Sequence, residues 1–540
     1  MKRITALLAA ILAVGALGAC GERSGNGLPG SSDASGTSSP TTAATTTATQ
    51  PVVATGTLDL GVVGLVSLDP LTNSSPSTVA VNRFLFQPLV GLDAKTSEPT
   101  PLLARKWSVN ATQTEFTLTL DAKAKFHDGS PVTAADAAAT LTRVKFASAP
   151  VAALLSDLPG TGIVAKDAHT LVLTTSSPDA DLVAKLSNPA FGILPAAAVA
   201  DPGAAFLTGG VGSGPFRVKS MSASLIELVP AAKHGPGAAP SLQRVVVHRY
   251  ASATEAAAAF TKGDVDLTWV GNEQWTTVSE SSTRAGVRPY LAVGYYGFNI
   301  ADPVLADARL RQAIVLAVNA EKVARAGFGR DAVAAEDVIS TAVPGGRRMA
   351  DTAGVAGDPV AAAKALVAQV YPNGGVPTIN IDFEDTVTQR AVVTELVAEM
   401  AAVGIPAAPR PHPAAEYSAF LAAGGAQMFR SGWASDAPTS FSFVNPSFWP
   451  GSPENVTNVG GAELTTALAE ASYATSSTAR AAKAREAADV VLAQYAALPI
   501  VQYQTRLAAT KNVRGLAVDA FGTFDPTGVT VVKSVQEGKS

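Results

Sequence analysis

Cysteine is almost absent from this sequence: its 540 residues include one, Cys20. A single thiol excludes an intramolecular disulfide and a thiolate metal cluster. Charged residues make up only 16% of the chain and the formal net charge is −4, so there is no broad basic field for nucleic acid. The five histidines are scattered, and no Gly-x-Ser-x-Gly, His-Glu-x-x-His or Walker motif is present. The sequence therefore predicts no enzyme, no cofactor, no metal site and no nucleic-acid partner.

The one cysteine lies at the end of an N-terminal export signal. Lys2 and Arg3 form a positive n-region, and an apolar stretch runs from Ile4 to Leu17. Leu17-Gly18-Ala19-Cys20 follows and resembles a bacterial lipobox, in which cleavage before the cysteine leaves its thiol to carry a lipid. We expect residues 1–20 to be a lipoprotein signal peptide. Acylated Cys20 would then hold the protein at the extracytoplasmic face of a bacterial cell membrane, because two acyl chains anchor stably where one is marginal.

Large apolar residues are also rare in the next segment. Residues 21–56 consist mainly of Ser, Thr, Gly, Pro and Ala, which is typical of a disordered tether. A flexible tether of roughly 35 residues would hold the folded part about 30 Å from the bilayer. No later stretch is long and apolar enough to span a membrane.

The rest of the chain predicts a mixed α/β protein, since Val- and Thr-rich runs alternate with Ala-rich ones. With 47% hydrophobic residues and this length, more than one core is expected. Strands are predicted at 57–63, 115–120, 170–173, 243–247 and 378–381. Helices are predicted at 133–143, 254–262, 307–326, 386–403 and 477–496. Thr133 with Asp136 predicts a capping-box variant at the first of them.

A series of short segments runs through the chain in one order. They are Ser67-Leu68-Asp69-Pro70, Phe86-Gln87-Pro88-Leu89-Val90, Pro101 to Trp107, Lys125 to Asp136, Gly212-Ser213-Gly214-Pro215-Phe216, Gly263-Asp264-Val265-Asp266, Phe298-Asn299, Arg309 to Ile314 and Gly432-Trp433-Ala434-Ser435-Asp436. In this order the series resembles the family 5 extracellular solute-binding proteins, the oligopeptide, dipeptide and nickel binders of ABC importers. The Lys125 to Asp136 block carries most of the resemblance. It is also architectural, since Asp128-Gly129 supplies a turn, and His127 is interpreted as a hydrogen-bonded histidine packed there.

The resemblance implies a two-lobed, periplasmic-binding-protein-like α/β clamp that closes about a hinge. The first lobe is expected at 57–90, 209–300 and 498–540, with an inserted subdomain at 91–208, and the second lobe at 301–497. The crossovers between lobes are expected near Phe298 to Asp302 and Leu498 to Gln504. The implied function is capture of an oligopeptide-like ligand for an ABC permease, by a monomer tethered to the bilayer.

The candidate ligand-binding residues are Asp436, Trp433, Ser435, Tyr295, Tyr296 and Trp269. In peptide-binding relatives a Gly-Trp-x-x-Asp segment places its aspartate on the ligand's amino group, and Gly432 to Asp436 has that spacing. Trp433 would supply an apolar wall. The competing interpretation of Asp436 is a loop brace. For Tyr295, Tyr296 and Trp269 it is an ordinary place in a core or a cross-strand pair.

Two other functions are compatible with the same resemblance. The segment after Asp436 is shorter than in relatives, and the chain is rich in alanine, which fits a lipoprotein with a non-transport role in envelope assembly or sensing. A binder of metal chelates is the second alternative, because nickel-type binders belong to the same family.

Overall fold

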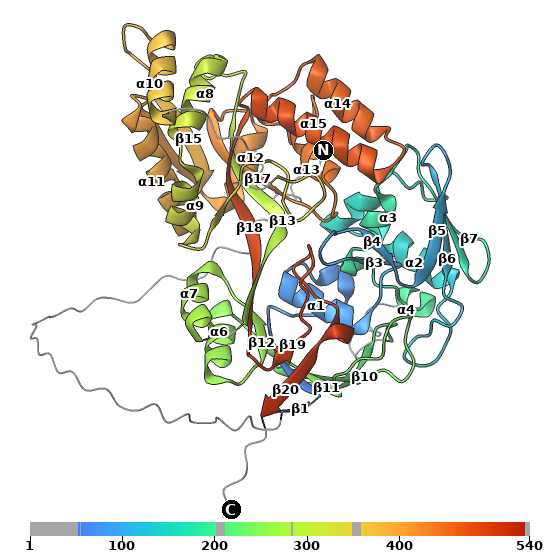
Figure 1. The fold of residues 1–540 in the computed structure, drawn as a ribbon. Helices are drawn as coiled ribbons and strands as arrows, with labels where there is room; N and C mark the ends of the chain where they lie inside the picture. The colour runs from blue at the N-terminus through green and yellow to red at the C-terminus, as the bar shows by residue number, and fades with distance from the viewer. Residues whose placement is uncertain (1–51, 55, 201–210, 282–283, 348–357, 535–540) are drawn as a thin grey trace, which may run out of the picture.

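The computed structural model describes residues 52–54, 56–200, 211–281, 284–347 and 358–534. The predicted signal peptide, Cys20 and nearly all of the predicted tether lie outside these residues. The chain folds as a mixed α/β protein (Figure 1). None of the helices in the described ranges has the length and apolarity needed to span a membrane.

The strands are β1 (Val52–Ala54), β2 (Thr57–Val63), β3 (Val90–Leu92), β4 (Pro99–Pro101), β5 (Ala104–Val109), β6 (Glu115–Leu120), β7 (Ile163–Ala165), β8 (Thr170–Thr174), β9 (Phe216–Met221), β10 (Leu225–Pro230), β11 (Arg244–Tyr250), β12 (Leu267–Trp269), β13 (Arg284–Phe298), β14 (Val333–Ala334), β15 (Ile379–Glu384), β16 (Ala407–His412), β17 (Met428–Ala434), β18 (Ala497–Ala509), β19 (Val513–Arg514) and β20 (Thr530–Ser534). The α-helices are α1 (Pro76–Leu85), α2 (Ala134–Lys145), α3 (Leu182–Lys185), α4 (Ala196–Ala200), α6 (Ala253–Lys262), α7 (Asn272–Ser281), α8 (Ala308–Ala317), α9 (Ala320–Phe328), α10 (Pro359–Val370), α11 (Val387–Ala402), α12 (Ala414–Ala422), α13 (Phe441–Phe448), α14 (Ala462–Ser472) and α15 (Ser477–Ala493).

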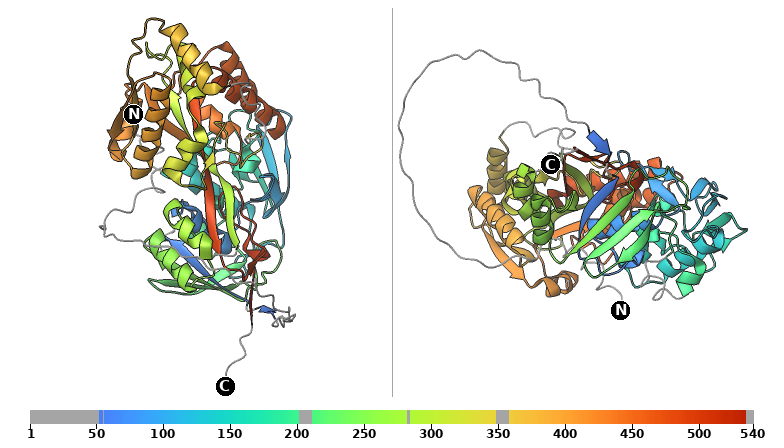
Figure 2. Two further views of the ribbon diagram at one scale, coloured as in Figure 1. Left: turned by 60° about the vertical axis from the view of Figure 1, so that its left-hand side comes forward. Right: turned by 90° about the horizontal axis from the view of Figure 1, so that it is seen from below.

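One sheet connects the two lobes. Its strand order is β16-β15-β17-β13-β18-β12-β2-β11-β10-β9, with β14 paired to β18. The long strands β13 and β18 run through both halves of the molecule (Figures 1 and 2). The inserted subdomain has its own sheet, in the order β5-β6-β8-β7. Residues 57–63 and 115–120, predicted as strands, are β2 and β6 with the same bounds.

Separate hydrophobic cores match this layout. One packs β2, β10 and β11 against α1, and a second lies within the inserted subdomain. In the second lobe a core lies on each side of the upper half of the sheet. Helices α8 to α11 enclose one, and α13 to α15 enclose the other. Because successive side chains of a strand point to opposite faces, Tyr296 lies in the first of these cores and Tyr295 in the second.

Local capping explains where several helices begin. Thr133 accepts the Asp136 N–H through its hydroxyl, and the Asp136 carboxylate accepts the Thr133 N–H in return, so the predicted capping box is confirmed. The prediction of one helix over 307–326 is wrong, because α8 ends at Ala317 and α9 begins at Ala320. Val318 is extended between them. Asn319 then accepts the Lys322 N–H at 3.0 Å as a new N-cap.

His127 forms hydrogen bonds between the inserted subdomain and the segment that leads into β9. The Gly212 N–H donates to its Nδ1 at 3.2 Å, and its Nε2 lies 2.9 Å from the Gly214 carbonyl oxygen. Only a neutral ring with its proton on Nε2 satisfies both contacts. Burial lowers the pKa of His127 to about 4. The expected role as a hydrogen-bonded histidine packed at a turn is confirmed.

The His127 contacts predict a pH-dependent loss of stability. The pKa of this imidazole is depressed in the folded state, so its contribution is complete above about pH 6.5 and is lost as pH falls toward about 4. The lowered pKa corresponds to a loss of about 3 kcal/mol in the free energy of unfolding once His127 is fully protonated. A His127→Gln variant keeps one donor and one acceptor but does not titrate. Its melting temperature between pH 4 and 7 should therefore fall less steeply than that of the wild type, whereas parallel curves would contradict the assignment.

Candidate functional site

The sheet passes from one lobe to the other at an interruption in the pairing of β13 with β18. Arg284 to Pro289 pair with Ala509 to Gln504, and pairing resumes where Val293 meets Gln502. Residues 290–292 have no partner on β18, although Ala292 pairs with Ala434 of β17. The expected crossover near Phe298 lies beyond this interruption, at a residue that is fully buried in a second-lobe core. We use the term junction for residues 290–292 with 502–504.

Gln502 satisfies backbone groups that the interruption leaves without strand partners. Its side-chain amide nitrogen lies 3.0 Å from the carbonyl oxygens of Tyr290 and Ala292, and its amide oxygen accepts the Thr341 N–H at 3.0 Å. The residue is 3% exposed. Buried carbonyl oxygens need such partners, so this side chain replaces the strand hydrogen bonds that the junction lacks.

Replacing Gln502 with leucine should therefore destabilise the protein. The variant leaves buried polar groups without partners, which costs about 1–3 kcal/mol. We expect a lower melting temperature and faster hydrogen exchange around residues 290–292 and 341. Gln369→Leu, on the exposed side of α10, is the matched control. Equal behaviour of the two variants would show that Gln502 is not needed at the junction.

Two sets of strand ends point toward the junction. β17 runs from Met428, opposite Phe298, to Ala434, opposite Ala292. From the other side, β2 and β12 run parallel, and Trp269 at the end of β12 pairs with Leu507. Ligands of α/β proteins bind outside the carboxyl ends of strands, at points where the topology switches. The segments just after β2 and β17 are therefore the best-placed binding elements, and Val66, after β2, is 79% exposed.

The segment after β17 is held by its backbone and by serine. The Ser435 N–H donates to the Leu291 carbonyl at 2.8 Å, which extends the pairing with β13. The Ser435 hydroxyl accepts the Ala437 N–H at 3.0 Å and lies 2.7 Å from the Ser442 hydroxyl. Ser435 therefore shapes the turn that presents Asp436.

Asp436 has a carboxylate without a partner among the described residues. The residue is exposed to solvent, yet the protein around its carboxylate displaces some water and raises the pKa above the usual value. Burial also raises the pKa of Tyr290 to about 12, with the negative charges of Asp436 and Asp519 adding to the effect. A carboxylate that has lost hydration and has no cation is ready to bind one.

The inserted subdomain touches this segment directly. The Asn188 side-chain amide donates to the Asp436 carbonyl oxygen at 2.8 Å, across 248 residues of sequence. Nearby, Arg480 of α15 lies 2.8 Å from Asp179 and 3.8 Å from Asp181, all in nearly complete burial. Figures 1 and 2 show α14 and α15 beside the inserted subdomain. Three parts of the chain thus meet around the Asp436 segment.

The six predicted ligand-binding residues fall into two groups. Trp433, Ser435 and Asp436 lie together at the end of β17, with Trp433 packed at the edge of a second-lobe core. The other three are buried: Tyr295 is 4% exposed, Tyr296 is 2% exposed, and Trp269 is 8% exposed. The Tyr296 hydroxyl donates to Gln389 at 3.2 Å, and the Trp269 indole N–H donates to the Gly522 carbonyl at 2.9 Å. This group supports the walls of the junction from within the cores.

Sequence reasoning missed Tyr290, Asn188 and Gln502. Tyr290 is the first residue of the stretch without a partner on β18, and it had no motif around it. Asn188 precedes Pro189, a pattern typical of a helix start, and it does cap the short 3-10 helix Pro189–Phe191. That local signal could not indicate its contact with Asp436. No group of three or more His, Cys, Asp or Glu side chains in the described part of the chain is arranged to hold a metal ion.

Comparison with known proteins gives a consistent result. Residues 98–454 match the model of the bacterial extracellular solute-binding proteins, family 5. A peptide-binding protein of an ABC transporter from Brucella ovis is 28% identical over 297 residues, which are 52% of this chain and 55% of that protein. The D,D-dipeptide-binding periplasmic protein DdpA of Escherichia coli is 33% identical over 39% of this chain and 42% of its own length. The chain thus spans about half the length of these curated relatives.

Solved structures share the fold over most of the chain. The unliganded open form of the murein tripeptide-binding protein MppA matches 89% of this chain and 99% of its own, with a TM-score of 0.81 and 21% identity. HbpA2 from Haemophilus parasuis matches 88% of this chain and 99% of its own, with a TM-score of 0.78 and 19% identity. The two-lobed fold expected from the sequence is confirmed.

Proposed function

The chain belongs to family 5 of the bacterial extracellular solute-binding proteins, and from this premise we propose that it binds an oligopeptide-like ligand at the junction of its lobes. The bound protein then delivers the ligand to an ABC permease. The first lobe, the inserted subdomain and the second lobe are the proposed parts of the clamp, with the boundary between the lobes at the junction in place of residues 300 and 498. The names of the Brucella and Escherichia coli relatives support a peptide as the ligand class.

The observation that carries the proposal is the unpaired carboxylate of Asp436. A ligand ammonium needs a charged partner once it leaves water, and a hydrogen bond to a charged group contributes about 1.5–3 kcal/mol. The Asp436 carboxylate is already partly desolvated. A ligand amine can therefore replace hydrogen bonds that the carboxylate no longer makes to water. Trp433, at the edge of a second-lobe core, supplies apolar surface three residues before Asp436, and exposed Val66 lies in the first-lobe segment after β2.

Closure of the lobes is the proposed signal to the permease. The interruption at residues 290–292 concentrates bending in a short stretch, because strand pairing stiffens the chain on both sides. A ligand that contacts both the β2 end and the β17 end makes more contacts in the closed arrangement than in the open one. Ligand binding therefore favours closure.

The protein is proposed to act as a monomer anchored outside the cell through Cys20. The Leu17-Gly18-Ala19-Cys20 segment supports acylation, and the family is extracellular. Metabolic labelling with a palmitate analogue should mark the wild type and leave Cys20→Ser unmarked. A labelled Cys20→Ser protein would rule out this anchor.

Native mass spectrometry of the protein, purified without denaturation, tests the ligand class. Fragmentation of whatever is released should give short peptides, and added peptides should raise the melting temperature. A released metal chelate would instead indicate the chelate-binding alternative. A protein that no peptide library stabilises would favour the non-transport role in the cell envelope.

A further inference from the structure

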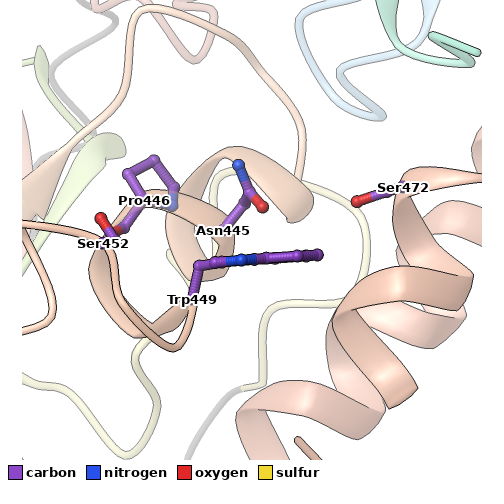
Figure 3. Close-up of a pocket in the computed structure, with 5 residues that line it drawn as sticks. All are labelled: Asn445, Pro446, Trp449, Ser452 and Ser472. Carbon is purple, nitrogen blue, oxygen red and sulfur yellow. The ribbon is translucent and has the colours of Figure 1, made fainter. Parts of the chain in front are cut away.

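A pocket lies in the second lobe, at the C-terminal end of α13. Its volume is about 410 Å³, and it is lined by Asn445, Pro446, Trp449, Ser452 and Ser472 (Figure 3). Asp436 precedes the N-terminal end of the same helix, which spans eight residues, or about 12 Å at 1.5 Å per residue. The pocket is therefore separate from the proposed peptide site.

The end of α13 holds the backbone of Trp449 in place. Pro446 lies inside the helix and removes one backbone donor, and the helix ends at Phe448. The Trp449 N–H donates to the Asn445 carbonyl at 3.2 Å, and the Asn455 amide holds the Trp449 carbonyl at 3.3 Å. Figure 3 shows the indole extending across the pocket, with Asn445 on one side of its plane and Ser472 of α14 beyond its edge.

The pocket presents hydrogen-bonding groups that the protein itself does not use. Among the described residues, neither the Asn445 side-chain amide nor the Trp449 indole N–H has a partner. The Ser472 hydroxyl donates to the Leu468 carbonyl at 2.9 Å and so keeps its oxygen lone pairs as acceptors. No charged side chain lines the pocket. It therefore combines a flat apolar face with neutral donors and acceptors around it.

We propose that this pocket binds a neutral saccharide ring. One face of a pyranose carries C–H groups that pack on an indole, and its hydroxyl groups both donate and accept hydrogen bonds at the rim. A phosphate or carboxylate needs a cation that the lining lacks. An ammonium ion needs a carboxylate or several aromatic rings, and the lining has one ring and no carboxylate. The ligand class that uses the indole, the Asn445 amide and the Ser472 hydroxyl oxygen together is a sugar of a glycan chain.

This proposal does not depend on peptide binding at Asp436. Glycan chains outside the cell offer many sugar rings to one protein. Weak binding of each ring, with a dissociation constant on the order of 1 mM, is therefore enough to keep the protein near them. The site would hold the tethered protein against surrounding glycan without occupying the junction.

The test uses the full chain in a zwitterionic detergent that contains no sugar. Chitotriose, cellotriose and maltotriose are titrated separately, with saturation-transfer NMR and tryptophan fluorescence as readouts. At least one trisaccharide should bind saturably. Trp449→Ala should weaken that binding by tenfold or more, Asn445→Ala by a smaller factor, and Trp449→Phe less than Trp449→Ala because it keeps a ring.

Controls separate this site from general effects of substitution. Phe146→Ala removes another exposed aromatic side chain, 69% exposed and on a different part of the molecule, and should leave sugar binding unchanged. Asp436→Asn should also leave it unchanged. The proposal fails if none of the three sugars binds saturably, or if Trp449→Ala and Asn445→Ala, both with wild-type melting temperatures, bind as tightly as the wild type.

Discussion

Replacing Asp436 with asparagine is expected to weaken binding of an amine-bearing peptide by about 10- to 150-fold, because the variant loses a charge-assisted hydrogen bond of about 1.5–3 kcal/mol. Isothermal titration with a peptide recovered from the purified protein measures this change. The same peptide acetylated at its amino group should bind the wild type about as weakly as the free peptide binds the variant.

The affinity should also depend on pH with a definite sign. Burial raises the pKa of Asp436, and only the ionised carboxylate pairs with an ammonium, so affinity falls as pH drops through that raised value. The variant should show no such fall. Because Asp436 is exposed, the same substitution should change the melting temperature of the empty protein only slightly, so the loss of binding would not reflect a folding defect.

Glu463→Gln is a suitable control, since it removes an exposed carboxylate from α14 of the same lobe. It should change neither affinity nor melting temperature appreciably. If Asp436→Asn binds peptide as tightly as the wild type, Asp436 is a loop brace and the ligand amine lies elsewhere.

Replacing Arg480 with methionine should cause the largest loss of stability. Arg480 and its partners Asp179 and Asp181 are 3% to 4% exposed, and the guanidinium also donates to the Pro178 and Ser472 carbonyls. Methionine leaves Asp181 with no cation of its own, and breaking a buried pair costs about 3–5 kcal/mol. We expect a clear fall in the melting temperature by calorimetry and faster proteolysis within residues 91–208.

The pH dependence of the Arg480→Met defect follows from the two carboxylates. Burial raises the pKa of Asp181 even with Arg480 present. Burial also acts to raise that of Asp179, but Lys185 and Arg480 together hold it below its ordinary value. Without Arg480 both pKa values rise. The defect should then be smallest below about pH 4, where the unfolded chain is also protonated, and should grow as pH rises.

A second substitution makes the Arg480 prediction specific. Asp181→Asn in the Arg480→Met background removes one buried charge and should recover part of the loss. Arg309→Met breaks an exposed pair with Asp307 and should cost less than about 1 kcal/mol. If Arg480→Met is no less stable than Arg309→Met, the buried cluster does not hold the inserted subdomain to the second lobe.

Local signals account for what could be predicted of the fold. Residues 57–63 and 115–120 alternate apolar and polar side chains, and both strands have the predicted bounds because each buries one face. Thr133 and Asp136 predicted a helix start because capping involves neighbours in sequence. The break at Asn319 had a similar local signal, but the continuous apolar pattern on both sides concealed it.

The candidate site was predictable only where it depends on a motif. Gly432 to Asp436 was identified by its spacing, whereas Tyr295, Tyr296 and Trp269 were chosen for residue type and position, and type does not reveal burial. Tyr295 and Tyr296 are adjacent, so they point to opposite faces of β13 and enter different cores. Only the packing on each face decides whether either meets ligand.

The sequence by itself determined the class of protein, the mixed α/β fold and the segment that carries Asp436, and it predicts an export signal that ends at Cys20. These depend on composition, on residues close in the chain, and on the order of segments along it. The tertiary structure alone decided that the Asp436 carboxylate has no partner within the described residues, that Asn188 of the inserted subdomain donates to the Asp436 backbone carbonyl, and that Gln502 stabilises the junction. Such properties depend on residues hundreds of positions apart, and the chain brings these together only when it folds.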